Sequence, residues 1–509
     1  MLKKFKRLFN TVKYLKVKQI YYRLFYFARA RVRKITRYKY DFLKKASVSK
    51  LQLKNSIENK YSLYENRKFS FLNLEYKVEN TIDWNYNEHG KLWTYNLTYF
   101  EYLKNKEDIS LVYDFIENIH TMKDGLEPFP ISLRGMNWIK FLSKFNIEDK
   151  KIDDSLYAQY YILLDNLEYH LLGNHLLENG FSLLFGAYYF RDDTLYTKAK
   201  EILEVELEEQ VLDDGAHFEL SPMYHQIMLF RVLDCINLVE KNDFKDKELL
   251  ELLTVKASVM LGWLKNMTFT NGNIPLLNDS ANGIAPSSKE LFAYADTLGL
   301  KILTTKLSKS GYRKVSNENY ESIVDIGNIG ADYIPGHAHS DTFNFVVQKD
   351  EREFIVDSGL STYETNERRT YERSTASHNT VEVNAKDQSE VWGGFRVADR
   401  AEVIEFNEYN NIIKATHDGY KKDNILHTRE WKFQENKIVI KDSLSNSAHA
   451  VFRLHFHPSI TKDTILASVV CSEDINIVNY KYAPEFNKLI EAFALEITFE
   501  KDLKVEINI

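Results

Sequence analysis

Cysteine, proline and glycine are scarce in this chain of 509 residues, which contains 2, 8 and 19 of them respectively. The two cysteines, Cys235 and Cys471, lie far apart and match no metal-binding or redox spacing, so we expect no disulfide framework. The shortage of proline and glycine leaves no low-complexity linker along the chain. Because 44% of the residues are hydrophobic, global disorder is also excluded and a sizeable core is expected.

Long apolar runs are absent as well. No uncharged stretch reaches the roughly 20 residues that a transmembrane helix needs. The chain begins with a basic stretch, Lys3–Arg7, like the start of a signal peptide, but further basic residues between positions 13 and 23 interrupt any apolar segment after it. We therefore expect no classical signal peptide and a location in the cytoplasm or at the inner membrane, with the periplasm less favoured.

Charge is distributed unevenly along the chain. Residues 1–50 contain 17 lysines and arginines and one acidic residue, Asp41, so this segment carries +16. Since the whole chain carries −6, the remaining residues carry −22. Two interpretations fit: peripheral association with an anionic membrane or an acidic glycan, or a solvated helical extension that packs on the main body. We expect no nucleic-acid partner.

The length predicts two or three domains, and the hydrophobic period changes near residue 315. Before that point, apolar residues recur at helical spacing, and short loops with Asp, Gly or Pro separate the segments. The predicted helices cover residues 155–172, 176–189, 197–212, 223–239 and 247–264. Many helices joined by short loops are typical of a helical array or toroid.

After residue 315 the period falls to two, which is typical of strands. The predicted strands cover residues 343–347, 353–356, 380–383, 412–416, 428–433, 438–440, 450–456 and 503–509. This half is therefore predicted to be an antiparallel β-sandwich, which makes the chain an α+β multidomain protein. We expect a basic helical segment at 1–60, a helical domain at 61–315 and a β-domain at 316–509, with a cleft for a long polymer between the last two.

Two stretches in the helical half are dense in polar and titratable residues. In the first, Asn174 follows a break in the helix pattern, where an amide side chain caps a helix or faces a ligand. In the second, residues 213–225, Ser221 and Pro222 suit the N-cap and first position of a helix, and Tyr224 would point from its first turn into a cleft. Simple capping also explains the first stretch, and in the second capping and function are compatible.

The β-rich half contains two His-x-His patterns. His337 and His339 fall on one side of the chain if it is extended, which is typical of metal ligands, a catalytic pair or a structural pair. Asp341 is close enough in sequence to orient an imidazole, which favours a functional role. The pattern recurs at His455 and His457, so it is not diagnostic, and we interpret that second pair as structural.

A two-histidine, one-carboxylate set is also present in this half. Asp357 ends a predicted strand, and His378 begins another. With His339 they make a ligand set suited to Zn²⁺ or a similar ion. Spacing alone does not show that the three side chains meet.

Different short motifs follow one another in a fixed order along most of the chain. They lie at residues 92–97, 128–134, 174–179, 218–225, 278–280, 336–341, 356–359 and 377–380. Together they resemble the heparinase II/III family of polysaccharide lyases. The resemblance implies an incomplete (α/α) toroid followed by a β-sandwich, in agreement with the change of period. It also implies cleavage of a uronic-acid-containing acidic polysaccharide by β-elimination.

The resemblance further implies three catalytic residues. Asn174 matches the residue that neutralises the uronate carboxylate, and its amide resembles the heparinase III branch of the family. Tyr224 and His337 match the catalytic tyrosine and histidine. β-Elimination needs a base for the C5 proton and an acid for the leaving oxygen, and the sequence does not decide which residue is which.

The resemblance extends to metal and substrate sites. His339, Asp357 and His378 match a divalent metal site, for which we expect zinc in a structural role. The residues expected to contact the substrate are Arg134, Asn137, Glu178 and Glu219.

Two other functions remain open for these residues. One is a metal-dependent glycan hydrolase in which the ion activates water, and the other is a non-catalytic glycan-binding or assembly protein. The predicted lack of export suggests capsule, O-antigen or exopolysaccharide metabolism at the inner face of the membrane. The polymer, its sulfation and the oligomeric state do not follow from the sequence.

Overall fold

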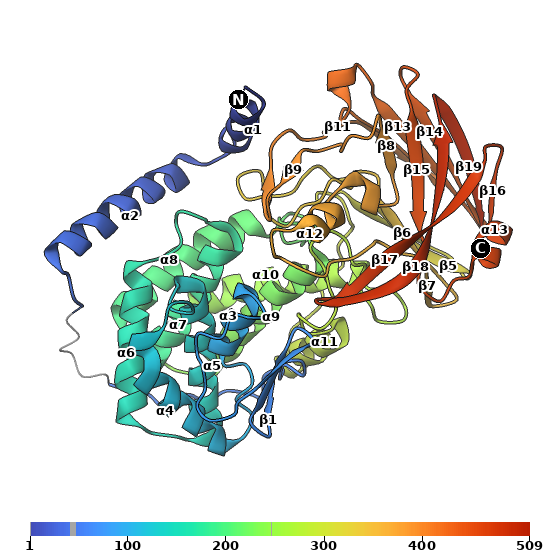
Figure 1. Ribbon diagram of the computed structural model, residues 1–509. Helices are drawn as coiled ribbons and strands as arrows, with labels where there is room; N and C mark the ends of the chain where they lie inside the picture. The colour runs from blue at the N-terminus through green and yellow to red at the C-terminus, as the bar shows by residue number, and fades with distance from the viewer. Residues whose placement is uncertain (1, 41–46, 246) are drawn as a thin grey trace.

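The computed structural model describes residues 2–40, 47–245 and 247–509. Figure 1 shows a helical domain beside a sheet-rich domain, with two N-terminal helices along their outer edge. These helices are α1 (Leu2–Val12) and α2 (Val17–Thr36). Arg7 of α1 pairs with Glu390 of the β-domain, whereas Arg29 of α2 pairs with Asp165 of the helical domain. The two helices of the basic segment therefore bridge the two domains, whereas residues 47–60 contain no helix and residues 41–46 of the predicted segment lie outside the described residues.

The helical domain begins with a small antiparallel sheet that the periodicity did not predict. Its strands are β1 (Leu63–Glu65), β2 (Lys68–Phe71) and β3 (Leu74–Lys77). The helices that follow are α3 (Lys91–Tyr99), α4 (Ile109–Asn118), α5 (Pro128–Phe145), α6 (Lys150–Asp165), α7 (Gly173–Phe190), α8 (Asp193–Gln210), α9 (Pro222–Lys241), α10 (Glu248–Met267) and α11 (Ser288–Thr297). The 3₁₀ helices η1 (Lys106–Asp108) and η2 (Ile119–Thr121) flank α4.

Helix α7 lies at the centre of this domain and is buried on all sides. It packs closely on α6, since a Cβ atom at Gly186 would lie 2.7 Å from the Tyr160 ring. The predicted helices are confirmed, but the one predicted for 155–172 ends at Asp165. The side-chain amide of Asn166 donates to Ile162 O, and the backbone N–H of Glu168 donates to Oδ1 of Asn179 in α7. The chain after α6 is therefore held in turns that lead to the start of α7.

The β-domain contains three large antiparallel sheets and a two-stranded one formed by β9 (Val391–Trp392) and β10 (Arg396–Val397). One has β4 (Tyr312–Ser316), β5 (Tyr320–Asp325), β6 (Phe345–Lys349) and β7 (Arg352–Ile355). A second has the order β11 (Val403–Tyr409), β12 (Ile412–His417), β13 (His427–Gln434), β14 (Lys437–Leu444), β19 (Asp502–Asn508) and β16 (Val469–Cys471). The third has the order β17 (Ile475–Glu485), β18 (Lys488–Phe499), β15 (Ala450–His455) and β8 (Val381–Val383).

Strict alternation explains why this half forms a sandwich. In β13 every second residue is buried, from His427 to Phe433, and the buried face joins a core with Ile440 of β14 and Phe452 of β15. Shorter elements join the strands: β9 (Val391–Trp392), β10 (Arg396–Val397), α12 (Glu367–Glu372), α13 (Lys462–Ser468), η3 (Thr375–Ser377) and η4 (Lys421–Asp423). All the predicted strands are present, and the predicted order of a toroid followed by a β-sandwich is confirmed.

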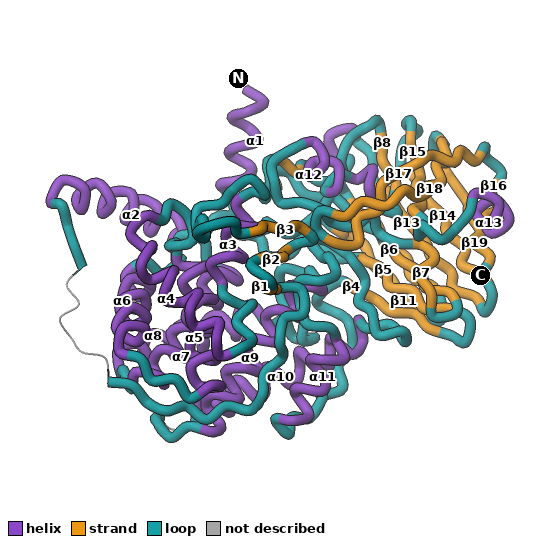
Figure 2. The backbone as a smooth tube through the Cα atoms, turned by 60° about the horizontal axis from the view of Figure 1, so that its bottom comes forward, coloured by secondary structure: helices purple, strands orange, loops and turns teal. Residues whose placement is uncertain are grey.

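Loops lie between the helices of the first domain and the strands of the second (Figure 2). Backbone bonds cross this interface, among them Asp279 N–H to His337 O at 3.0 Å. Strand β4 begins at Tyr312, just before the predicted boundary at 316, because Tyr312 already pairs with Asp325. Within the described residues, no helix combines the length and the apolar character needed to cross a bilayer.

Candidate active site

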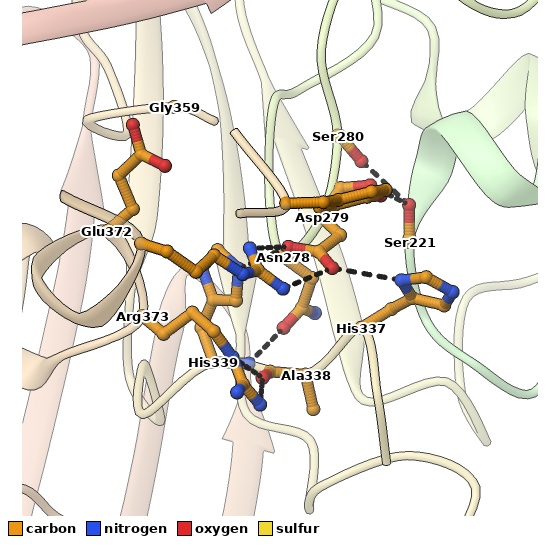
Figure 3. Close-up of polar contacts among 12 residues, drawn as sticks. Ser221, Asn278, Asp279, Ser280, His337, Ala338, His339, Gly359, Glu372 and Arg373 are labelled. Carbon is orange, nitrogen blue, oxygen red and sulfur yellow. Dashed lines mark hydrogen bonds and ion pairs between the residues drawn. The ribbon is translucent and has the colours of Figure 1, made fainter. Parts of the chain in front are cut away.

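Four segments that are far apart in the sequence meet at the domain interface. They are the start of α7 with Asn174, the loop and first turn of α9 with Glu219 and Tyr224, the loop at Asp279, and the turn at His337. Figure 3 shows the Asp279 carboxylate joined to His337, with Asn278 and Ser280 on either side in the chain. Three of the four segments come from the helical half, so the site belongs to both domains.

His337 is oriented by Asp279. Its Nδ1 lies 2.9 Å from Asp279 Oδ2, and its Nε2 lies 3.4 Å from Asn174 Nδ2 and 3.5 Å from Glu219 Oε2. Because a carboxylate only accepts, Nδ1 carries the hydrogen and donates it to Asp279. In the neutral imidazole, Nε2 then has its lone pair directed toward Asn174 and Glu219. The side chain is 12% exposed, so a ligand can reach it.

Asp279 is the centre of a buried ionic network. Both of its carboxylate oxygens accept from Arg369, with Nη2 at 2.7 Å from Oδ2, and Oδ1 also lies 2.8 Å from His339 Nε2. Burial by itself would raise the pKa of Asp279, but the Arg369 charge and the hydrogen bonds from His337, His339 and Arg369 bring that pKa well below its usual range. Asp279 is therefore a fixed negative charge against Nδ1 of His337.

Glu219 positions Asn174. Its carboxyl group accepts from the Asn174 backbone N–H at 3.2 Å and from Asn174 Nδ2 at 3.1 Å. Burial raises the pKa of Glu219, and the nearby His337 and the Asn174 hydrogen bonds oppose this shift only in part. A carboxyl group with a raised pKa is protonated at higher pH, and in its neutral form it does not repel an anion. The pair of Glu219 and Asn174 can therefore accommodate an anionic group.

Tyr224 lies over the His337 ring. The two ring centroids are 3.8 Å apart at an interplanar angle of 26°. Tyr224 stands in the first turn of α9, where the N-cap Ser221 accepts its backbone N–H at 3.2 Å, as the Ser221-Pro222 pattern predicted. Its hydroxyl is 3.2 Å from the Tyr363 hydroxyl. Burial raises the pKa of Tyr224 above its usual range despite the Tyr363 bond, so the phenol holds its proton at neutral pH.

Backbone strain accompanies three of these segments. Leu172, Leu220 and Asn278 have φ angles of +61°, +57° and +54°. Each stands within two residues of a site residue, namely Asn174, Glu219 or Asp279. Left-handed conformations of residues other than glycine cost free energy and occur preferentially at functional sites.

The predicted metal ligands lie near one another behind His337. The rings of His339 and His378 have centroids 5.3 Å apart, and His378 Nδ1 is 2.7 Å from Asp357 Oδ2. However, His339 Nε2 contacts Asp279, and no three His, Cys, Asp or Glu side chains in the described ranges converge as a metal-binding group. Two buried ring nitrogens, His339 Nδ1 and His378 Nε2, have no hydrogen-bond partner among the described residues. Unpartnered imidazole nitrogens are suitable ligands for a metal ion. The metal site therefore stays a prediction that these two nitrogens support.

Two of the residues predicted to contact the substrate are instead buried and bonded within the helical domain. Arg134 is fully buried, and its guanidinium donates to Thr98 O and Gly125 O, each at 3.0 Å. Glu178 is equally buried and pairs with Arg231 at 3.1 Å. Both side chains hold elements of the toroid together, so the structure does not support their contact with a polymer.

Asn137 and Glu219 are placed differently. Asn137 lines a cavity of about 710 Å³ beside α9, where its Nδ2 donates to Tyr99 O at 2.8 Å. Glu219 belongs to the cluster around Asn174. A contact of either residue with substrate remains a prediction.

Three residues that contact this cluster were not predicted as site residues from the sequence: Asp279, Tyr363 and Arg369. Asp341 was expected to orient an imidazole, but its Oδ2 has no partner among the described residues, and Asp279 orients His337 instead. The acidic residue within the motif at 278–280 was the available signal for Asp279. Tyr363 and Arg369 stand in a loop and a short helix with no pattern of their own.

The fold and this site define a class of two-domain protein in which a toroid and a β-sandwich share one cluster of titratable side chains. The chain belongs to the heparinase II/III family. The family's N-terminal part, heparinase II/III N-terminus, matches residues 138–297, and the part described as heparinase II/III-like, C-terminal, matches residues 303–501. The family predicted from the ordered motifs is therefore confirmed.

Relatives of known function show more distant similarity. A heparin-sulfate lyase of Bacteroides stercoris is 23% identical over 316 residues, which cover 57% of this chain and 46% of the relative. A second, from Bacteroides thetaiotaomicron, is 23% identical over 341 residues, or 58% and 46%. The chain thus spans about half the length of these curated relatives in the matched region.

Solved structures establish the fold. A crystal structure of heparinase III matches with a TM-score of 0.67 at 14% identity and covers 92% of this chain and 88% of that one. The heparan sulfate lyase from Pedobacter heparinus matches with a TM-score of 0.54 at 16% identity, with 85% and 79% covered. At such identities the likeness shows a shared architecture.

Proposed function

We propose that this protein is a polysaccharide lyase that cleaves a uronic-acid-containing acidic polysaccharide by β-elimination. The observation that carries the proposal is His337, whose Nδ1 is held by Asp279 while Nε2 faces Asn174 beneath the Tyr224 ring. The names of the relatives, heparin-sulfate and heparan sulfate lyases, support an acidic glycan as substrate.

Asn174 and Glu219 would receive the uronate carboxylate. The Asn174 amide, whose Nδ2 donates to Glu219 at 3.1 Å, would donate to the carboxylate instead, and Glu219, whose pKa is raised, would not repel the anion when protonated. Stabilising negative charge on this group stabilises the enolate-like state that forms when the C5 proton leaves. Asn174 thus makes a weakly acidic C–H bond accessible to a base.

His337 would act as the base and Tyr224 as the acid. Nε2 of His337 takes the C5 proton, the C5 electron pair forms the C4–C5 double bond, and the C4–O bond breaks. The Tyr224 phenol gives its proton to the departing oxygen, and the Tyr363 hydroxyl at 3.2 Å donates to the resulting phenolate. The raised pKa of Tyr224 favours this order, since a protonated phenol is a ready donor and a poor base.

His339, Asp357 and His378 would hold a divalent ion, for which zinc fits the donor set. When bound, the ion would supply a crosslink and a positive charge behind the turn that carries His337. The orphaned nitrogens of His339 and His378 support this assignment. The catalytic protons would move through Tyr224 and His337 alone. The setting in capsule, O-antigen or exopolysaccharide metabolism remains a prediction.

The test is to incubate the protein with a panel of sulfated and unsulfated uronate glycans and to record the ultraviolet absorbance of the unsaturated product. The absorbance should appear with at least one glycan and disappear in the Tyr224→Phe and His337→Ala variants. Saturated products, together with loss of turnover on chelation, would instead establish the hydrolase. Binding without any product would establish the non-catalytic protein.

A further inference from the structure

An apolar stripe runs along the outward side of α1. Phe5, Leu8, Phe9 and Val12 stand at the spacing of one helix face and are 72%, 51%, 61% and 40% exposed. In a surface helix of a globular protein, such a stripe faces the core and the polar face meets water. In α1 this arrangement is reversed.

Helix α2 shows the same reversal over a greater length. Val17, Tyr21, Leu24, Val32 and Ile35 share one face at the helical angle, and Val17 and Ile35 are each 83% exposed. The helix has 20 residues, so its stripe extends over about 30 Å. Exposed apolar surface of this extent, bordered by polar residues, marks an interaction site.

Polar contacts on the opposite faces determine how the two helices are oriented. Asn10 Nδ2 of α1 donates to Asp399 Oδ1 at 2.7 Å. Gln19 of α2 is buried, and its Nε2 donates to Leu171 O at 2.8 Å, while Arg33 pairs with Asp165 at the other end of the helix. The protein body therefore holds both helices with their apolar sides outward.

The charge of this segment is entirely positive. Residues 1–40 contain 14 lysines and arginines and no aspartate or glutamate. The side chains of Lys6, Lys13, Lys18, Arg23 and Lys34 are exposed, which places cations beside the apolar stripes. An apolar face bordered by cations is the pattern of helices that lie in the interface of an anionic membrane.

We propose that α1 and α2 dock this protein on an anionic lipid bilayer, with the apolar stripes at the boundary of headgroups and acyl chains and the cations on lipid phosphates. Two other occupants fit less well. An acidic glycan satisfies the cations but offers no apolar depth for residues such as Leu24 and Ile35. A second copy of the chain would bring together two segments with 14 cations each, which like-charge repulsion opposes.

Docking in this way places the catalytic interface close to the membrane. Gln19 Nε2 lies 2.8 Å from Leu171 O and 3.4 Å from Tyr333 O. These two residues precede Asn174 and His337 in the chain, so α2 contacts both segments that lead into the site. The docking itself does not depend on the proposed lyase activity.

Flotation of the full chain with vesicles tests the proposal. Vesicles of phosphatidylglycerol and phosphatidylethanolamine should carry the protein upward, whereas phosphatidylcholine vesicles should not, and added NaCl should weaken the binding. The double variant Leu24→Asp/Ile35→Asp should lower the affinity for the anionic vesicles by roughly tenfold or more, because two apolar groups no longer insert.

A matched control is available on the toroid surface. Val205 and Val255 are 55% and 53% exposed on α8 and α10, so the variant Val205→Asp/Val255→Asp adds the same charge to exposed helical positions. It should bind vesicles as the unmodified protein does. Both double variants should keep the unmodified melting temperature, since all four residues are exposed.

Three results would overturn the proposal. They are the absence of binding to anionic vesicles, equal losses in the two double variants, and a concentration-dependent dimer that Leu24→Asp/Ile35→Asp abolishes while vesicle binding persists. Lyase activity on soluble glycan should be unchanged in that variant. A failure of the docking proposal is thus distinguishable from a failure of the proposed function.

Discussion

The β-domain contains the same sequence pattern, His-x-His, in two surroundings. At the domain interface, the 12% exposed His337 donates to Asp279 and directs Nε2 toward Asn174. In strand β15, His455 is buried, and its Nδ1 lies 3.1 Å from Asn379 Oδ1. Burial lowers the pKa of His455 to about 3, so this ring stays neutral.

The difference lies in what each ring faces. Asp279 comes from the helical half of the chain and makes Nδ1 of His337 a donor, so that the lone pair of Nε2 points toward Asn174 at the interface between the domains. Asn379, by contrast, links His455 to Phe345 O and Val356 O inside the sandwich. The first ring has a partner from another domain and is accessible to a ligand, whereas the second has a partner from the same core and is buried.

Replacement of His337 by alanine should have the largest effect. Within the described residues, His337 is the imidazole that contacts Asn174. Its loss should lower kcat/KM by about 10²- to 10⁴-fold, the usual contribution of a general base. The melting temperature should change little, because the side chain is partly exposed at the interface. Product absorbance and calorimetry measure the two quantities, and substantial remaining turnover would refute the assignment of the base.

Replacement of Asp279 by asparagine should reduce both activity and stability. The buried Arg369 would lose its partner, which costs about 3–5 kcal/mol of unfolding free energy, and His337 would lose the group that orients it. Denaturant unfolding and steady-state kinetics measure these losses.

The matched control is Asp341→Asn. Asp341 is the acid nearest to the pair in sequence, and burial raises its pKa to about 6. Its neutral amide should leave kcat/KM close to that of the unmodified protein. Equal losses in the two variants would mean that Asp279 has no special role in orienting His337.

Most of the fold was predictable because local chemistry and tertiary structure agree. Ser221 and Pro222 start α9, and alternation in β13 predicts one buried face. The end of α6 was not predictable, because the apolar spacing continues beyond Asp165 while the backbone is held by Asn179 of the next helix. A contact with a distant residue overrode a local pattern there.

The site was predictable in part for the same reason. Asn174, Tyr224 and His337 came from motifs, and the structure brings them together. Asp279 stands 58 residues from His337, and the nearer Asp341 was the natural expectation from spacing alone. Arg134 had the charge expected of a substrate contact, but spacing does not show that a side chain is buried within the toroid.

Replacement of His455 by glutamine should affect stability rather than catalysis. The variant loses the ring that packs on Tyr480 and the contact with Asn379, which should cost about 1–3 kcal/mol of unfolding free energy. Turnover per folded molecule should remain near that of the unmodified protein. If activity instead fell as it does in His337→Ala at equal folded fraction, the distinction between the two patterns would be lost.

The same variant should change the pH dependence of stability. Because the pKa of His455 is lowered to about 3 in the folded state, the unfolded chain binds one more proton between that value and the ordinary pKa near 6.5. The folded protein therefore loses stability as the pH falls through this window. His455→Gln should reduce the slope of unfolding free energy by about 1.4 kcal/mol per pH unit there, and unfolding curves that keep the original slope would contradict it.

Replacement of His457 by alanine should have the smallest effect. This ring is 28% exposed. Its polar contacts are with Ser459 at 2.9 Å and Glu353 at 3.5 Å, and its centroid lies 5.7 Å from that of Tyr482. A pair of this exposure contributes little, so the unfolding free energy should change by less than about 0.5 kcal/mol and kcat/KM should not change. A loss comparable to that of His455→Gln would show that both histidines of the second pair stabilise the domain and would contradict the expected difference between them.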